Sequence, residues 1–223
     1  MKLIEVFNTY QGEGPDSGRQ MTLIRFRKCD RVENKCACSW CDTLVKMRIS
    51  AEADYDIDTI SEMVRKTGGL MITGGEPGYG NNISDTRTLL QMKGYDIANI
   101  ETNGCNITNL CNFISDENLH EKVKIIYSPK FFNPEETDIA IAKTKMVVGF
   151  PFVYIKVVDD KSVYVKDYLY EVTKMKVRKD QIWVMPEGDS LETSLENSKE
   201  TFDLIEKYGV NFSSRNHIIF GFI

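Results

Sequence analysis

Short apolar runs that each end in a polar turn recur along this chain, and they constrain its fold more than any other feature. Six such runs are typical of buried strands: 22–26, 70–73, 98–101, 124–127, 153–158 and 182–185. Four further segments carry apolar residues at helical spacing: 57–65, 85–92, 163–175 and 192–208. Strands that alternate with helices predict a parallel α/β architecture.

The number of strands narrows this architecture to an open barrel. Six strand-and-turn repeats are too few for a complete eight-stranded barrel, and the 223 residues leave little room for more. The sequence therefore predicts a partial, TIM-like (β/α)6 barrel. Because no internal repeat, low-complexity tract or linker interrupts the chain, we expect residues 1–223 to form a single domain. Functional residues of such folds gather at the carboxyl ends of the strands.

Composition limits the partners and the compartment. Lys and Arg total 28 against 33 Asp and Glu, a net charge of -5, which argues against direct nucleic-acid binding. No apolar stretch approaches the length that spans a bilayer, and residues 1–6 alternate apolar and polar side chains, unlike an export signal. We expect a cytoplasmic protein without a membrane partner.

Four cysteines fall within thirteen residues: Cys29, Cys36, Cys38 and Cys41. In a reducing compartment, clustered cysteines are more often metal ligands or catalytic groups than disulfides. A four-iron cluster normally takes four thiolates, so a site with three protein ligands leaves one iron open to another ligand. The segment is therefore a candidate iron–sulfur site.

The spacing ranks the possible ligands. Cys38 and Cys41 are two residues apart, which lets both sulfurs turn toward one metal site. As third ligand we favour Cys29, which leaves the end of the first strand, over Cys36, whose side chain in extended chain points away from that of Cys38. The alternative is a closed zinc site that uses all four cysteines, although structural zinc usually shows two separated ligand pairs.

Several motifs, taken in order, resemble one enzyme family. Gln11-Gly12-Glu13-Gly14 and the run 38–43, Cys-Ser-Trp-Cys-Asp-Thr, resemble 7-carboxy-7-deazaguanine synthases of the radical S-adenosylmethionine (SAM) superfamily. The likeness continues through Thr-Gly-Gly-Glu-Pro at 73–77, Glu-Thr-Asn-Gly at 101–104, Ser-Pro-Lys at 128–130, Met-Pro-Glu-Gly at 185–188 and His217. One feature departs from the superfamily: eight residues separate Cys29 from Cys38 where three are usual, an interval that varies within the synthases.

The resemblance implies a division of labour on the cofactor side. Cys29, Cys38 and Cys41 would hold a 4Fe-4S cluster whose open iron binds SAM, and because the radical forms on SAM, no side chain needs to be catalytic. The residues implied to bind SAM are Gly74, Gly75, Glu76, Asn103, Ser128 and Lys130. Glycines allow close backbone approach, and Glu76 offers an acceptor to an amino group. The alternative is ordinary turn chemistry for the Gly-Gly, Asn-Gly and Ser-Pro pairs.

The implied substrate is 6-carboxy-5,6,7,8-tetrahydropterin, a flat ring with one carboxylate. Its implied contacts are Gln11, Gly12, Glu13, Arg25, Thr73, His217 and Ile223, with Thr43 as a ligand of Mg²⁺. Arg25 suits a carboxylate and Glu13 suits a guanidine-like N–H edge. Each has a plainer alternative: Arg25 pairing an internal Glu, Thr43 capping a turn or helix, residues 11–14 forming a simple loop, and His217 lying in a strand.

The expected activity is a lyase reaction that forms 7-carboxy-7-deazaguanine and ammonia, a step toward queuosine and other 7-deazapurines. The resemblance also implies a homodimer and a flavodoxin-like reductant. Two alternatives remain: another small radical SAM enzyme such as a glycyl-radical activase, or a non-enzymatic zinc-stabilised module. The sequence gives neither the role of Cys36 nor the destination of the deazapurine, whether transfer RNA, DNA or a secreted product.

Overall fold

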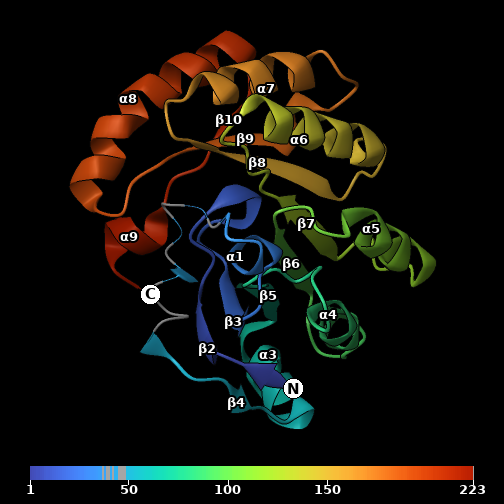
Figure 1. Cartoon of the computed structure of the whole chain (residues 1–223). Helices are drawn as coiled ribbons and strands as arrows, with labels where there is room; N and C mark the ends of the chain where they lie inside the picture. The colour runs from blue at the N-terminus through green and yellow to red at the C-terminus, as the bar shows by residue number, and fades with distance from the viewer. Residues whose placement is uncertain (37, 39–40, 42, 45–48, 223) are drawn as a thin grey trace.

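A computed structural model describes residues 1–36, 38, 41, 43–44 and 49–222 of the chain (Figure 1). In this part of the chain one eight-stranded sheet has the order β10-β9-β8-β7-β6-β5-β3-β2. Its strands are β2 (Glu5–Tyr10), β3 (Gln20–Phe26), β5 (Gly69–Gly74), β6 (Ile97–Thr102), β7 (Val123–Tyr127), β8 (Val153–Asp159), β9 (Ile182–Pro186) and β10 (Asn211–Phe212). A separate antiparallel pair consists of β1 (Lys2–Leu3) and β4 (Ala53–Asp54).

The strand order identifies an open barrel. From β3 to β10 all neighbours are parallel and follow one another along the chain, whereas β2 runs antiparallel to β3 at one edge. A doubly wound sheet would instead reverse its order at a switch point. The six predicted strands correspond to β3 and β5–β9, and the predicted partial (β/α)6 barrel is confirmed.

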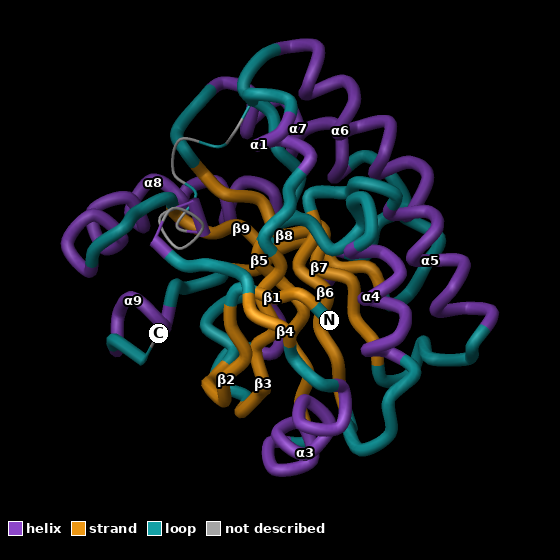
Figure 2. Tube along the Cα trace, turned by 60° about the horizontal axis from the view of Figure 1, so that its bottom comes forward, coloured by secondary structure: helices purple, strands orange, loops and turns teal. Residues whose placement is uncertain are grey.

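Helices cover the outer face of the strands, as Figure 2 shows. The long ones are α3 (Ile57–Thr67), α4 (Asn82–Leu90), α5 (Ile107–Asp116), α6 (Pro134–Val147), α7 (Val163–Thr173) and α8 (Leu191–Tyr208). Short turns are η1 (Gly14–Asp16), α1 (Asp30–Glu33), η2 (Lys179–Gln181) and α9 (Asn216–Phe220). The four predicted helices match α3, α4, α7 and α8, and α5 and α6 complete the remaining connections. No helix of the described residues is long and apolar enough to cross a membrane.

Local chemistry sets where the helices begin and end. The Asp56 carboxylate accepts hydrogen bonds from two backbone N–H groups of the first turn of α3, and Gly68 ends this helix in the left-handed conformation at φ 68°. Helix α8 begins with a capping box between Ser190 and Thr193 and ends at Gly209, at φ 65°. These capping residues fix where each helix begins and ends, and therefore where the chain re-enters the sheet.

Alternation along each strand separates the core from the barrel interior. In β3, Ile24 and Phe26 pack toward the helices in the main apolar core, while Leu23 and Arg25 face inward. A smaller apolar cluster of Met21, Leu23, Met71 and Ile97 fills the interior near the strand beginnings. The inward positions nearer the carboxyl ends are therefore left for polar side chains.

The segment after β10 connects the two edges of the open barrel. The Ser213 backbone N–H donates to the Val184 carbonyl of β9 at 2.9 Å, and the Ser213 hydroxyl accepts from the Gly14 N–H at 2.8 Å. Farther along, the Thr9 hydroxyl of β2 donates to the Phe222 carbonyl at 3.2 Å. The end of the described chain thus lies beside β2, as Figure 1 shows.

Candidate active site

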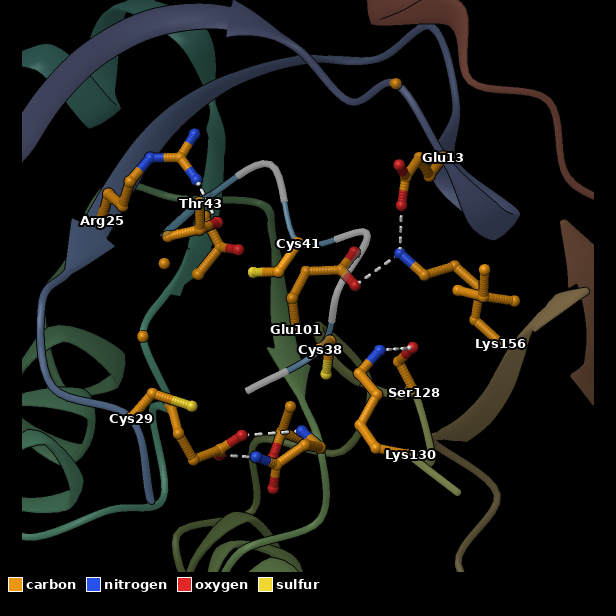
Figure 3. A pocket seen from close by; sticks show the side chains of 18 of the residues that line it. Glu13, Arg25, Cys29, Cys38, Cys41, Thr43, Glu101, Ser128, Lys130 and Lys156 are labelled. Carbon is orange, nitrogen blue, oxygen red and sulfur yellow. Dashed lines mark hydrogen bonds and ion pairs between the residues drawn. The ribbon is translucent and has the colours of Figure 1, made fainter. Parts of the chain in front are cut away.

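One cavity of about 220 Å³ lies at the carboxyl ends of the parallel strands (Figure 3). Every predicted site residue that the structure describes lines it: Gln11, Gly12, Glu13, Arg25, Cys29, Cys38, Cys41, Thr43, Thr73, Gly74, Gly75, Glu76, Asn103, Ser128, Lys130 and His217. The remaining one, Ile223, lies outside the described residues. The structure brings these residues together, and their individual roles stay predictions.

Three of the four clustered cysteines face this cavity. Cys29, Cys38 and Cys41 line it, whereas Cys36, which is also described, does not. In the described part of the chain no three His, Cys, Asp or Glu side chains converge closely enough to hold a single ion. A closed zinc site requires such convergence, while a four-iron cluster can bind each thiolate to a separate iron. The three cysteines on the cavity wall match the number of ligands predicted for the cluster, and their role stays a prediction.

Cys29 is fixed by the short helix that follows it. Its carbonyl accepts from the Glu33 N–H at 3.1 Å, and its Sγ lies 3.6 Å from the Asp30 carboxylate. Burial raises the pKa of the Cys29 thiol to about 12, although backbone N–H groups of α1 act in the opposite direction. The Cys29 thiol would therefore lose its proton only when the positive charge of a bound metal stabilises the thiolate.

The two glycines after β5 are required by the chain itself. A Cβ on Gly75 would run into the Lys28 carbonyl, and a Cβ on Gly74, at φ 103°, would run into the backbone of Phe26. The Gly75 N–H donates to the Phe26 carbonyl at 2.7 Å. We expected these glycines to admit SAM, but their missing side chains first admit the end of β3, directly before Cys29.

Glu76 ties the end of β5 to the end of β6. Its carboxylate accepts from the Thr102 hydroxyl at 2.5 Å, the Asn103 N–H at 2.7 Å and the Gly78 N–H at 2.8 Å. Burial raises the pKa of Glu76 to about 7, although these three neutral donors lower it. The predicted SAM acceptor is thus held rigidly by bonds within the protein.

The later strand ends combine turn chemistry with a place in the cavity. The Asn103 side chain accepts from the Cys105 N–H at 2.9 Å and donates to Asp30 at 2.7 Å. The Lys130 ammonium donates to the Ser128 hydroxyl at 2.7 Å, and burial lowers the pKa of Lys130. The turn chemistry given as the alternative is present, and the same turns place polar atoms on the cavity wall, while contact with SAM stays a prediction.

Arg25 forms the internal ion pair given as the alternative, and its contact with a substrate carboxylate stays a prediction. Its Nε donates to the Glu5 carboxylate at 2.6 Å, the internal ion pair considered as an alternative. Its NH1 donates to the Thr43 hydroxyl at 3.0 Å within the cavity (Figure 3). The guanidinium and the predicted Mg²⁺ ligand are therefore neighbours. A carboxylate between them would offset the repulsion between two cations.

The substrate side is built from the loop after β2 and the segment after β10. The His217 ring packs against Gly12, and its Nε2 lies 3.7 Å from the Glu13 carboxylate. His217 belongs to helix α9, so the alternative of a strand residue is wrong. The Gln11 amide donates to the Glu101 carboxylate at 3.1 Å. The Glu13 loop is thus linked to β6 and to α9.

Sequence reasoning assigned no role to five charged residues of this cavity: Arg31, Glu101, Lys156, Glu187 and Arg215. The Lys156 ammonium lies 2.5 Å from the Glu13 carboxylate and 2.8 Å from that of Glu101 (Figure 3). The Arg215 guanidinium lies 3.4 Å from Glu13 and donates to the Gly188 carbonyl. A lysine inside the apolar run 153–158 was an available signal, because a buried cation needs a buried partner.

These cations determine the charge of Glu13. Burial raises the pKa of its carboxyl group, but Lys156, His217 and Arg215 together outweigh burial and lower the pKa to about 2. Glu101 differs, because burial and the nearby charge of Glu13 raise its pKa despite the attraction of Lys156. Two carboxylates that share one cation are thus driven apart in pKa.

Comparisons with known proteins show what the fold and the sequence of this chain are similar to. No family model matches the chain. The crystal structure of QueE from Escherichia coli aligns over 97% of this chain and 94% of that one, with a TM-score of 0.57 and 18% sequence identity. That likeness shows the fold, an open partial barrel.

The sequence is similar to named synthases. A 7-carboxy-7-deazaguanine synthase from Haemophilus influenzae is 34% identical over 46% of this chain and 44% of its own. One from Clostridium acetobutylicum is 32% identical over 50% of each chain, so this chain spans about half the length of these two curated relatives. One from Hyperthermus butylicus is 24% identical over 98% of this chain and 92% of its own. The resemblance based on motifs is confirmed.

Proposed function

We propose that the chain is a radical SAM lyase that converts 6-carboxy-5,6,7,8-tetrahydropterin to 7-carboxy-7-deazaguanine and ammonia, a precursor of queuosine and other deazapurines. One observation carries the proposal. A single cavity is lined on one side by three cysteines and the Gly-Gly-Glu segment, and on the other by the polar residues Gln11, Glu13 and Arg25. The proposal extends to residues 1–223 as one domain, in the cytoplasm.

On the cofactor side, Cys29, Cys38 and Cys41 would hold a 4Fe-4S cluster, and the residues at the ends of β5, β6 and β7 would hold SAM. When bound, the cluster and SAM would supply the radical chemistry that the reaction needs. The protein's own contribution is to bind, orient and exclude water. Glu76 and Asn103, joined at 2.7 Å, form a rigid wall for the amino-acid part of SAM.

On the substrate side, the polar groups match a flat heterocycle with one carboxylate. Arg25 and an Mg²⁺ ion on Thr43 would share the carboxylate, since NH1 and Oγ1 lie 3.0 Å apart. Glu13 would accept from the guanidine-like edge of the ring, because the carboxyl group is ionised well below neutral pH. Gln11, Gly12, Thr73, His217 and Ile223 would complete the site.

Two partners belong to the same proposal: a flavodoxin-like reductant and a second copy of the chain in a homodimer. Of the alternatives, a glycyl-radical activase fits less well, because the substrate side presents groups for a small ring rather than a protein segment. A zinc module fits less well because Cys36 stands apart from the other three cysteines at the cavity.

The experiment is anaerobic reconstitution with iron and sulfide, followed by SAM, reductant, Mg²⁺ and the carboxytetrahydropterin, with the product detected by mass. C38A is expected to lose iron and product, and the matched variant C36A to keep both. If SAM were cleaved and no deazaguanine formed, the assignment as a radical SAM enzyme would stand and the proposed substrate would be wrong. Zinc bound in place of iron, and lost in C36A, would overturn the enzyme proposal.

A further inference from the structure

Lys156 occupies an unusual place for a lysine. It lies in the middle of β8 on the inward face, together with Val158, while Ile155 and Val157 pack toward the helices. Its residue surface is 5% exposed. A side chain this buried keeps its charge only if opposite charges lie within hydrogen-bonding distance. Methionine would fill the same space without that cost, so the ammonium group calls for a functional explanation.

The ammonium joins two other elements of the barrel. Its Nζ contacts Oε2 of Glu13, in the loop after β2, at 2.5 Å, and Oε2 of Glu101, in β6, at 2.8 Å. These elements are 143 and 55 residues away from Lys156 in sequence. One cation therefore bridges two carboxylates whose strands, β2 and β6, are not neighbours in the sheet.

The other groups around the pair cannot replace this cation at both carboxylates. Arg215 and His217 face Glu13 at 3.4 and 3.7 Å. Glu101 has the neutral Gln11 amide at 3.1 Å. Lys130 also faces the cavity from the end of β7 and donates to the Ser128 hydroxyl. Without Lys156, the buried Glu101 would compete with Glu13 for counter-charge, and one of the two would take up a proton.

Protonation would change what the cavity recognises. An ionised carboxylate only accepts hydrogen bonds, whereas a protonated one also donates. Each carboxylate uses Oε2 for Lys156, so its Oε1 is directed to other donors. A ring edge that carries N–H donors binds two acceptors but is repelled by an acceptor turned donor. The charge of Lys156 would thus set the selectivity of this wall.

We propose that Lys156 is a positioning residue that holds Glu13 and Glu101 as a fixed pair of ionised acceptors for the N–H edge of the substrate ring. The ligand part of the proposal, that the two carboxylates bind the ring edge, rests on the proposed function. The charge part, that Lys156 keeps both carboxylates ionised, does not. The variants are K156M, K156R, which keeps the charge, and K156M/E101Q, which removes one acid. K161M is the matched control, since Lys161 pairs with Glu200 on the surface at 3.3 Å.

The first arm needs no ligand and measures urea unfolding of each variant between about pH 5 and pH 8. In K156M the folded-state pKa of Glu101 should rise further above its unfolded value, so stability is kept at low pH and lost as pH rises. The deficit of K156M against the wild type should therefore grow with pH. K156R and K156M/E101Q should show no such slope. A pH-independent deficit in K156M would assign Lys156 a merely structural role and overturn the proposal.

The second arm measures binding of 7-carboxy-7-deazaguanine by calorimetry to the reconstituted protein with SAM and no reductant. Wild-type affinity should change less than about threefold between about pH 6 and pH 7.5. K156M should bind at least about tenfold more weakly at the lower pH and recover in part at the higher. K156R should restore the flat profile, and K156M/E101Q should bind weakly throughout.

The two arms separate the two proposals. A wild-type protein that does not bind the deazaguanine would count against the proposed substrate, while the unfolding arm would still decide the role of Lys156. Wild-type affinity and a flat profile in K156M would overturn the ligand part. The same changes in K161M would show that they arise from any lost lysine and would overturn the whole proposal.

Discussion

The cavity holds two buried carboxylates with opposite surroundings. Glu76, on the cofactor side, accepts from three neutral groups of the described residues, two backbone N–H groups and one hydroxyl, at 2.5 to 2.8 Å. Glu13, on the substrate side, faces Lys156 at 2.5 Å, Arg215 at 3.4 Å and His217 at 3.7 Å. The pKa of Glu76 is about 7 and that of Glu13 about 2.

The difference shows how the two halves of the site are built. Three hydrogen bonds from neutral donors do not offset the desolvation of Glu76, whereas Lys156, His217 and Arg215 together more than offset that of Glu13. The cofactor side is accordingly held by backbone geometry, and the substrate side by charge. A change of backbone should damage the first half most, and a change of charge the second.

The largest effect should follow from G75A. The added methyl group meets the Lys28 carbonyl and must displace the segment after β3, which leads directly to Cys29. We expect a loss of about 4 kcal/mol of unfolding free energy in urea, and little iron bound after reconstitution.

The control is G149A, because a Cβ on Gly149 meets no atom within 4 Å. G149A should keep both stability and iron. If G75A were as stable as G149A and bound iron normally, the backbone of the cofactor side would be more adaptable than the comparison implies.

The same contrast between backbone and side chains explains how far the sequence could predict the fold. The six strands are dense apolar runs whose ends are marked by glycine, proline or polar residues, so their bounds agree with β3 and β5–β9 within a few residues. Helix α6 gives a weaker signal: its stretch Ile139-Ala140-Ile141-Ala142 lacks helical spacing of apolar and polar residues, and Ile139 is exposed. Helices of this kind depend on tertiary packing.

The sequence could predict those site residues that lie directly after the end of a strand. Residues such as Cys29, Gly75 and Asn103 stand in motifs next to such ends, and parallel topology brings those ends together. Lys156 and Arg215 stand in no motif, and their value depends on partners more than 100 residues away, Glu13 in both cases. Which buried charges become partners depends on how the folded chain brings distant strands together, and the local sequence does not show it.

The second prediction uses pH to sharpen the comparison. The folded pKa of Glu13, about 2, lies below its ordinary value of 4.5, so its ionisation stabilises the fold above about pH 4.5 and this is lost as pH falls toward 2. E13Q should be less stable than the wild type by about 3 kcal/mol at neutral pH, with the gap closing in acid.

Glu76 should give the opposite slope. Its folded pKa of about 7 lies above 4.5, so its protonation stabilises the fold below about pH 4.5, and this is lost as pH rises through 7. Relative to E76Q, the wild type should therefore lose stability over that range. Urea unfolding of both variants against pH provides the measurement, and parallel slopes would show that the two surroundings are equivalent.

The smallest effect should come from G12A, at the contact between the Glu13 loop and α9. A Cβ on Gly12 would run into the His217 ring, and Gly12 also accepts the Asn216 N–H at 2.9 Å. We expect a loss of about 1 kcal/mol, because a side chain can move aside where a backbone carbonyl cannot. Faster hydrogen exchange should be confined to residues 213–222. G12A/H217A, which removes the ring, should restore slow exchange in these residues. If exchange stays fast in the double variant, the backbone hydrogen bond from Asn216 is what holds α9 to the substrate side. In that case charge is not what orders this half of the site.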